Sequence, residues 1–373
     1  MKNTKTPRSL PLDALRGLLI ILMALDHANH FIAQKHSPGE YWGGAFPAYK
    51  DSLTFLTRFV THLAAPGFFF LMGAGMMLFT RSRRKQGWSE WAIIKDFIVR
   101  GGLLIALQLL VVNRAWELSP SGWALETYVG VLFALGGGMI LGSLLLWIEP
   151  KYLLVLTVIL FLGTELLTPN PELWNQAFST VQRLLLVPGG DLNLWVNYPI
   201  LPWIESITLG MVFGFWLAKD SHQAFNRALW LGAGFLMAFV AIRLLGGFGN
   251  IRPREGNDWL AFLNVVKYPP SLTFTLLTTG LTLIILWLFS LAGERLQHFL
   301  TQPLAVFGRV PLFFYIFHLF LYAALGIWVA PGETSLLIMY LYWLMGLLIL
   351  YPLCLGYGWL KGQQTPHSIL RFF

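Results

Sequence analysis

The sequence predicts an all-α integral membrane protein, a bundle of about ten transmembrane helices that forms a single domain over residues 1–373. Two observations lead to this prediction. Hydrophobic residues make up 56% of the chain and charged residues only 12%, whereas a soluble domain averages about 25% charged residues. The hydrophobic residues also gather in long runs, and a run of about 20 apolar residues crosses a bilayer as a helix.

Ten segments are apolar enough to span a membrane, and charged or turn-rich stretches separate them. The predicted spans are residues 12–33, 57–80, 97–113, 124–148, 152–168, 198–218, 228–246, 271–292, 303–328 and 334–358. If all ten cross, the three longest connections lie on the same side of the membrane: 34–56, 169–197 and 247–270. The sequence contains no repeat of 20–50 residues and no soluble segment, so one membrane domain is the simplest account.

The distribution of basic residues predicts the orientation. With the N-terminus in the cytoplasm, 17 of the 26 Lys and Arg residues fall at the inner ends of the spans. Basic loops stay in the cytoplasm, so we expect both termini inside and a multipass protein of the cell inner (plasma) membrane. The net charge of +8 gathers in short loops and forms no stripe, which excludes a nucleic-acid partner.

The first predicted span carries several ionisable side chains. Arg16 and His27 are eleven residues apart, which puts them on one helix face, about 16 Å apart along the axis. Asp26 and His30 are four residues apart, so the carboxylate can orient that imidazole. Ionisable groups inside a span are costly and are therefore candidates for function.

Three histidines, His27, His30 and His36, fall within ten residues and share the region with an acid and an arginine. This set favours a proton-handling site. Two other interpretations stay open. Histidines near a membrane surface are often only hydrogen-bonded interface residues, and His-x-x-His spacing can chelate a metal ion. Because no further ligand cluster accompanies them, we expect no metal.

Later segments add further candidates. Arg58 and His62 lie one turn apart in the second span, ahead of Pro66-Gly67, which loosens the helix and predicts a polar cavity. Arg309, at a helix entry near the cytoplasmic surface, suits a phosphate-bearing ligand, and His318 follows about two turns deeper. The aromatic residues of the outer loops form either an interfacial belt or a sugar-binding platform.

These motifs resemble a known family. Leu12–Gly17 and Met23–His27 resemble the first helix of the transmembrane acyltransferases, in which Arg is followed after ten residues by His. More closely, the chain resembles the bacterial relatives of heparan-alpha-glucosaminide N-acetyltransferase. The stretches that carry this resemblance cover the chain nearly end to end: Thr57–Gly67, Tyr198–Trp203, Lys267–Ser271, Gly308–His318 and Tyr351–Cys354.

The resemblance implies transfer of an acetyl group from cytoplasmic acetyl-CoA to an acceptor across the membrane. In the lysosomal enzyme an acetyl-handling histidine follows a lysine, and Lys35-His36 resembles that place. The wider acyltransferases have histidine at the position of His27, so the resemblance supports both histidines. The large lumenal domain of the lysosomal enzyme has no counterpart here, which leaves the acceptor open.

We therefore expect a membrane acyltransferase that acetylates a sugar or envelope glycan on the outer side. Its expected partners are acyl-CoA, the glycan acceptor and membrane lipid, and the chain could form a homodimer. The alternative is a proton-coupled transporter, which also fits ten spans with buried ionisable groups.

The candidate site residues fall into three groups. The expected catalytic residues are His27, His36, His62, Arg58 and Asp26. The expected cofactor-binding residues are Arg16, Arg309 and His318, and the expected substrate-binding residues are His30, Trp42, Trp203 and Lys267.

Overall fold

The structure, a computed structural model, describes residues 9–36, 39–329, 334–364 and 368, and it is mostly helical. Seven helical segments are long and apolar enough to cross a membrane: 52–85, 150–167, 200–219, 221–245, 272–290, 311–328 and 336–363. Several cations used to predict the orientation lie outside the described residues: Lys2, Lys5, Arg8 and Arg371. The count of ten spans and the cytoplasmic side of both termini therefore stay predictions.

The first half of the chain forms one helix after another in the predicted order. The helix α1 continues without a break through a π-helical turn, η1, so that the first predicted span is one continuous helix. The elements are α1 (Leu10–Ala28), η1 (Asn29–Ala33), α2 (Ser52–Thr61), α3 (Ala64–Lys85), α4 (Glu90–Leu107), η2 (Gln108–Val112), α5 (Asn113–Glu117), α6 (Val131–Ser143) and α7 (Pro150–Leu167).

The second half begins with short elements in the connection after α7 and then returns to long helices. These elements are η3 (Pro171–Leu173), α8 (Thr180–Leu185), α9 (Ile200–Lys219), α10 (Ser221–Leu245), α11 (Trp259–Leu263), α12 (Leu272–Ser290), α13 (Glu294–Leu296), η4 (Gln297–Thr301), α14 (Gln302–Gly308), α15 (Pro311–Val329) and α16 (Leu336–Gln363). The predicted entries at Tyr198–Trp203 and Lys267–Ser271 do precede or open helices, α9 and α12.

A small sheet departs from the all-helical prediction. Its strands are β1 (Thr127–Val129), β2 (Gly189–Gly190) and β3 (Leu194–Val196), in the order β1-β3-β2. β1 runs parallel to β3, and β2 runs antiparallel to it. The prediction of one helix over 124–148 is therefore wrong at its start, because Thr-Tyr-Val favours a strand and the extended Gly130 delays α6 to Val131.

Two predicted spans are broken by prolines. Pro66 has no N–H to donate to the carbonyl of His62, so α2 ends at Thr61 and α3 begins at Ala64. Pro311 likewise separates α14 from α15, so that the span predicted over 303–328 consists of two helices. The first break places His62 at the C-terminal end of α2, between the two helices.

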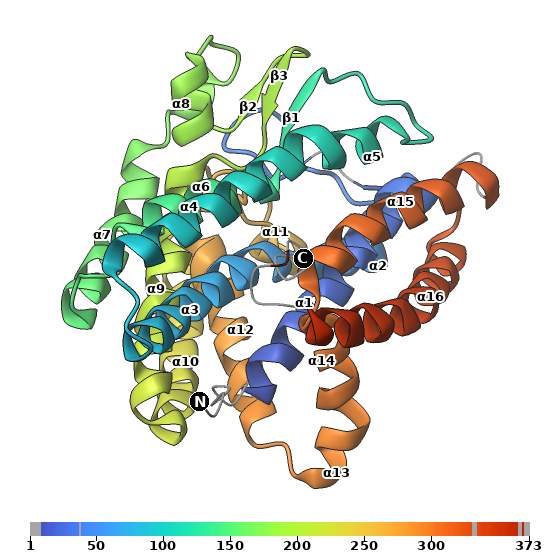
Figure 1. Ribbon diagram of the computed structural model, residues 1–373. Coiled ribbons are helices and arrows are strands. Elements are labelled where there is room, and N and C mark those ends of the chain that lie inside the picture. Colours follow the sequence, from blue (N-terminus) through green and yellow to red (C-terminus); the bar gives the residue numbers. More distant parts are fainter. Residues whose placement is uncertain (1–8, 37–38, 330–333, 365–367, 369–373) are drawn as a thin grey trace.

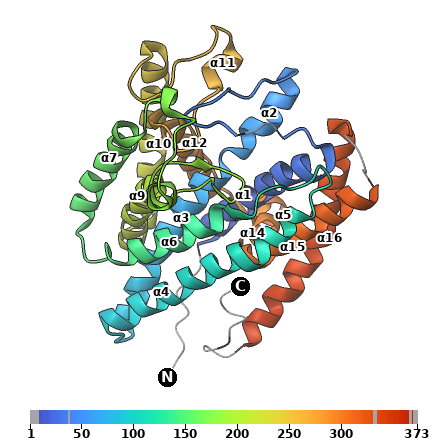
Figure 2. The same ribbon diagram turned by 90° about the horizontal axis from the view of Figure 1, so that it is seen from above.

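The helix α1 lies in the middle of the bundle, where it contacts α2, α3, α12, α14, α15 and α16 (Figure 1). Seen from above, α7, α9 and α10 lie on one side of α1, and α15 and α16 lie on the other (Figure 2). Glycines allow its closest approach: a Cβ at Gly17 would lie 1.8 Å from the backbone oxygen of Leu304, and one at Gly308 would lie 1.9 Å from that of Asp13. This contact holds α14 against the first helix.

The three longest connections meet at one end of the bundle. The backbone N–H groups of Trp42 and Lys267 donate to Tyr268 and Glu40 respectively, both at 2.8 Å, and these bonds join the first connection to the third. The indole of Trp42 donates to the carbonyl of Pro188 at 3.0 Å, which joins the first connection to the second. The three connections thus contact one another directly, which agrees with the prediction that they lie on the same side of the membrane.

Candidate active site

A polar cavity of about 90 Å³ lies between the C-terminal half of α1 and the three connections. Its walls come from α1, α2, α3, the sheet and the segment before α12. The lining residues are Met23, Asp26, His27, His36, Thr61, Ala64, Ala65, Phe68, Trp116, Tyr128, Val131, Asn197, Tyr198, Lys267, Tyr268 and Tyr315. Four of the residues singled out from the sequence, Asp26, His27, His36 and Lys267, are thereby brought to one space.

Arg58 stands behind this cavity and joins two carboxylates. Its Nη1 donates to both oxygens of Asp26, at 2.7 and 2.9 Å. Its Nε and Nη2 donate to the two oxygens of Glu40, at 3.0 and 2.9 Å. The Arg58 side chain is 2% exposed, so this bidentate pairing is shielded from water and holds α2 against α1 and the first connection. Arg58 itself does not line the cavity.

Glu40 is the residue that sequence reasoning missed here. It is fully buried, and its Oε1 lies 3.2 Å from Nε2 of His62 as well as close to Arg58. Burial favours its protonated form, but Arg58 and His62 outweigh burial and hold the pKa of Glu40 well below its usual range. The sequence could have drawn attention to Glu40, because it is one of only two acidic residues in the connection 34–56. Nothing in the sequence, however, identified its partners.

His36 joins the same network from the other side. Its Nε2 lies 2.9 Å from Nη1 of Arg58 and 3.3 Å from an oxygen of Asp26. Nε2 of His36 therefore lies between a guanidinium, which can only donate, and a carboxylate, which can only accept. In this arrangement His36 lines the cavity, but its Nε2 is already engaged by Arg58.

His27 has a different partner, His318 of α15. Nδ1 of His27 lies 2.6 Å from Nε2 of His318, and Nδ1 of His318 lies 2.9 Å from the carbonyl oxygen of Phe314. The carbonyl can only accept, so a neutral His318 is protonated on Nδ1 and accepts on Nε2. His27 must then donate from Nδ1, which leaves its Nε2 without a proton. A histidine in this form can act as a base.

Lys267 brings a cation to the cavity. It is 3% exposed, and among the described residues no hydrogen bond or ion pair engages its Nζ, which lies 5.0 Å from the centre of the Tyr268 ring. Burial, reinforced by the nearby charge of Arg58, lowers the pKa of Lys267 to about 8. A buried ammonium without a protein partner is suited to an oxygen that carries, or develops, negative charge.

The small sheet positions hydroxyl and amide groups that also line the polar cavity. Tyr128 lies in β1, and Asn197 follows β3, so the parallel pairing of these strands brings the two side chains together. Asn197 donates to the Tyr128 hydroxyl at 3.0 Å and accepts from Tyr41. Sequence reasoning missed Tyr128 because its segment was predicted to be helical, and it missed Asn197 because a polar residue in a connection is not conspicuous.

The remaining substrate-binding candidates lie outside the cavity. His30 packs against Trp116 and lies 3.2 Å from the hydroxyl of Ser119. Trp42 is fully buried under the second connection, and Trp203 is 1% exposed and stacks on Phe69. These aromatic residues are packing elements in this structure, and neither indole faces the space that His27 lines.

The cofactor-binding candidates divide into two places. Arg16 donates to Asp13 at 3.0 Å and to the carbonyl of Gly308 at 2.9 Å, and Nε of Arg309 lies 3.6 Å from the other oxygen of Asp13. These two arginines therefore share one carboxylate at the start of α1. His318 lies away from them, against His27. Within the described ranges no group of three His, Cys, Asp or Glu side chains is placed to hold a metal ion.

Comparison with known proteins supplies the family. Residues 8–244 match "Heparan-alpha-glucosaminide N-acetyltransferase, catalytic", a match that includes His27, His36 and Arg58. The human heparan-alpha-glucosaminide N-acetyltransferase is 28% identical over 130 residues, which is 35% of this chain and 18% of the human protein. The mouse protein is 29% identical over 124 residues, or 33% of this chain and 17% of the relative.

The matched region thus spans less than a fifth of the length of these curated relatives, although the family match covers more than half of this chain. Together with its seven long apolar helices, the match identifies a multipass membrane protein. The chain belongs to the family of the heparan-alpha-glucosaminide N-acetyltransferase catalytic region.

Proposed function

We propose that this protein is a membrane acyltransferase that moves an acetyl group from cytoplasmic acetyl-CoA to a hydroxyl or amine of a sugar or envelope glycan. The observation that carries the proposal is the cavity in which the unprotonated Nε2 of His27 and the unpaired ammonium of Lys267 lie together. A base and an oxyanion-stabilising cation are the two groups that acyl transfer requires. Membership of an N-acetyltransferase family supports the same reaction.

The size of the cavity fits the acyl group better than the acceptor. A volume of about 90 Å³ equals that of a few water molecules, which is enough for an acetyl group and too small to enclose a sugar. We place the phosphates of the donor near Arg16 and Arg309, at the end of α1 predicted to face the cytoplasm. Both guanidinium groups contact Asp13, and arginine is suited to bidentate binding of a phosphate.

In the proposed reaction, Nε2 of His27 takes the proton of the acceptor hydroxyl or amine as that atom bonds to the acetyl carbon. Lys267 stabilises the negative charge that develops on the carbonyl oxygen. The carbon–sulfur bond then breaks, and the leaving thiolate takes up the proton that His27 accepted, which returns His27 to its neutral form. A general base of this kind typically contributes 10²–10⁴-fold to the rate.

Arg58 has a positioning role in this proposal. Its three nitrogens donate to Asp26, Glu40 or His36, and Arg58 does not line the cavity, so we assign it no contact with the substrate. The network fixes the first connection against α1 and so holds His36 and Lys267 at the cavity wall. His36 is the alternative acyl-handling histidine, and an acetylated His36 intermediate would make the transfer ping-pong.

The test uses purified protein, acetyl-CoA labelled in the acetyl group, and a panel of sugars and envelope glycans. We expect label to reach an acceptor in the wild type and His27→Ala to lower the turnover by at least about 10²-fold. His222→Ala is the matched control, because His222 is an exposed histidine of α10.

No transfer of label from wild-type protein to any acceptor would contradict the proposal, and full turnover in His27→Ala would contradict the role of that residue. Protein in liposomes that exchanges a sugar substrate without acetyl-CoA would instead support the alternative, a proton-coupled transporter. Without an acceptor, label trapped on wild type but not on His36→Ala would support an acetylated His36, and equal trapping on both would exclude it.

A further inference from the structure

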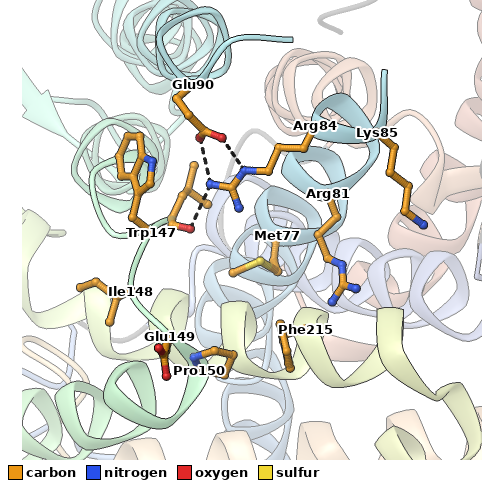
Figure 3. Close-up of a pocket in the computed structure, with 11 residues that line it drawn as sticks. Met77, Arg81, Arg84, Lys85, Glu90, Trp147, Ile148, Glu149, Pro150 and Phe215 are labelled. Atoms are coloured by element: carbon orange, nitrogen blue, oxygen red, sulfur yellow. Dashed lines mark hydrogen bonds and ion pairs between the residues drawn. The ribbon is translucent and has the colours of Figure 1, made fainter. Parts of the chain in front are cut away.

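A second cavity, of about 630 Å³, lies at the other end of α3, away from the polar cavity (Figure 3). Its walls come from the end of α3, the start of α4, the connection between α6 and α7, and Phe215 of α9. The two cavities share no lining residue. Along α3, Arg81 is 13 residues beyond Phe68 of the polar cavity, which is about 20 Å at the rise of an α-helix.

Three basic side chains line this second cavity, and two of them have no acidic partner. Arg84 pairs with Glu90 at 2.7 Å, and the nearby Glu149 pairs with Lys151 at 3.0 Å. Among the residues that the structure describes, Arg81 and Lys85 form no ion pair. Figure 3 shows the Arg81 guanidinium beside Phe215, whose ring centre lies 5.1 Å away. The cavity therefore offers two uncompensated positive charges.

The surroundings of these charges are apolar and open to the outside of the bundle. Trp147, which lines the cavity, is 47% exposed, and Tyr152 in the first turn of α7 is 57% exposed. Further along α7, exposed side chains are apolar over several turns, among them Val155, Val158 and Ile159. In a membrane protein such a face contacts acyl chains, and exposed Trp and Tyr at a helix end lie at the level of the headgroups.

From this arrangement we infer that the second cavity binds the phosphate headgroup of an anionic phospholipid, with its acyl chains along the exposed face of α7. The phosphate would lie between Arg81 and Lys85, and Trp147 would lie beside the glycerol. Basic pockets between membrane helices at the cytoplasmic surface are suited to such headgroups. A soluble phosphate, including those of CoA, offers the same charge but would leave the apolar face of α7 unused.

The experiment measures lipid binding to the purified full chain in neutral detergent by native mass spectrometry, with phosphatidylglycerol and phosphatidylcholine as probes. We expect wild type to prefer phosphatidylglycerol. The double variant Arg81→Gln/Lys85→Gln should bind this lipid about thirtyfold more weakly, because each basic residue contributes about 1 kcal/mol and about 1.4 kcal/mol corresponds to a tenfold change in affinity. The matched control, Lys95→Gln/Arg295→Gln, removes two exposed charges elsewhere and should bind like wild type.

A charge-preserving variant, Arg81→Lys/Lys85→Arg, keeps the test decisive if the glutamine variant does not fold. Its affinity for phosphatidylglycerol should stay within about threefold of wild type, because the attraction is mainly electrostatic. Equal binding of the two lipids by wild type, or equal loss in the control variant, would overturn the inference. Displacement of bound phosphatidylglycerol by millimolar CoA or inorganic phosphate would assign the cavity to a soluble phosphate and also overturn it.

Discussion

At the level of single residues, the contact between His27 and His318 decides which nitrogen of His27 can accept a proton. Replacing His318 by Phe removes the acceptor for Nδ1–H, so His27 no longer has one preferred tautomer. We expect His318→Phe to lower kcat by about 10²-fold, within the range that general base catalysis contributes. Turnover with labelled acetyl-CoA measures this effect.

The conservative variant separates positioning from packing. The amide oxygen of Gln can accept from Nδ1 of His27, so His318→Gln should restore most of the activity that His318→Phe loses. Both variants should keep the thermal midpoint of wild type within a few degrees. Equal loss of kcat in both variants would mean that His318 acts only through the packing of α15 against α1.

Lys267 predicts a dependence on pH. Its pKa of about 8 lies below the usual value for lysine, so the side chain is charged below about pH 8 and becomes neutral as the pH rises through that value. Because the proposed role needs the charged form, kcat/KM should fall above about pH 8. The guanidinium of Lys267→Arg stays charged at all accessible pH values, so this variant should lose the alkaline decrease. Its activity at neutral pH should be lower than that of wild type, because a planar guanidinium differs in shape from an ammonium group.

A pH profile of kcat/KM for the two proteins measures this prediction. Activity that rises through pH 8 in wild type would show that the neutral amine is the active form, and would make Lys267 a base instead of an oxyanion-stabilising group. An unchanged alkaline decrease in Lys267→Arg would assign the titration to another residue.

Sequence reasoning identified part of the site because charge inside a membrane segment is costly. Asp26, His27 and Arg58 are conspicuous for this reason, and the structure brings all three to one region. Glu40 and Asn197 are not conspicuous, because polar residues in connections have no such cost in the sequence. Their partners lie 18 and 156 residues away, and only the fold pairs them.

At the level of elements, the close packing of α3 against α9 requires a glycine at Gly73 but not at Gly75, two residues further along α3. A Cβ at Gly73 would lie 2.0 Å from the backbone oxygen of Ile207, whereas one at Gly75 would meet nothing within 4 Å. Gly73→Ala must therefore separate the two helices, and overpacking of this kind costs about 1–3 kcal/mol. We expect a lower thermal midpoint for Gly73→Ala, measured by thermal unfolding in detergent.

Gly75→Ala is the control, two residues further along the same helix. Alanine has the higher helix propensity, by up to about 1 kcal/mol, so this variant should be as stable as wild type or slightly more stable. Equal destabilisation by the two substitutions would show that the close α3–α9 contact does not limit stability.

Element positions were predictable where hydrophobic runs are long and end at caps. The predicted span 271–292 corresponds to α12, whose Ser271 accepts from the N–H of Phe274 as a cap. The boundaries failed where a short segment pairs at long range, as β1 does with β3, since periodicity contains no information about a partner 67 residues away. The break at His62 was indicated by Pro66, but its exact place depends on the backbone bond that Pro66 cannot make.

At the level of the whole molecule, one helical stretch outside the seven candidate spans is also long enough to cross the membrane. The continuous helical stretch from Glu90 to Glu117, formed by α4, η2 and α5, contains 28 residues, or about 42 Å, which exceeds the bilayer core of about 30 Å. Its start is joined to the end of α3 by the Arg84–Glu90 ion pair. Beyond its other end, Ser119 contacts His30 near the polar cavity.

These contacts predict that Gln86 and Glu117 lie on opposite sides of the membrane. Both side chains are exposed, and the single native cysteine, Cys354, is 1% exposed, so wild type serves as an unlabelled blank. On intact cells, a membrane-impermeant maleimide should label Glu117→Cys but should label Gln86→Cys only after permeabilisation. Labelling of both variants from the same side would mean that α4 does not cross, and labelling of Gln86→Cys alone from outside would invert the orientation predicted from the basic residues.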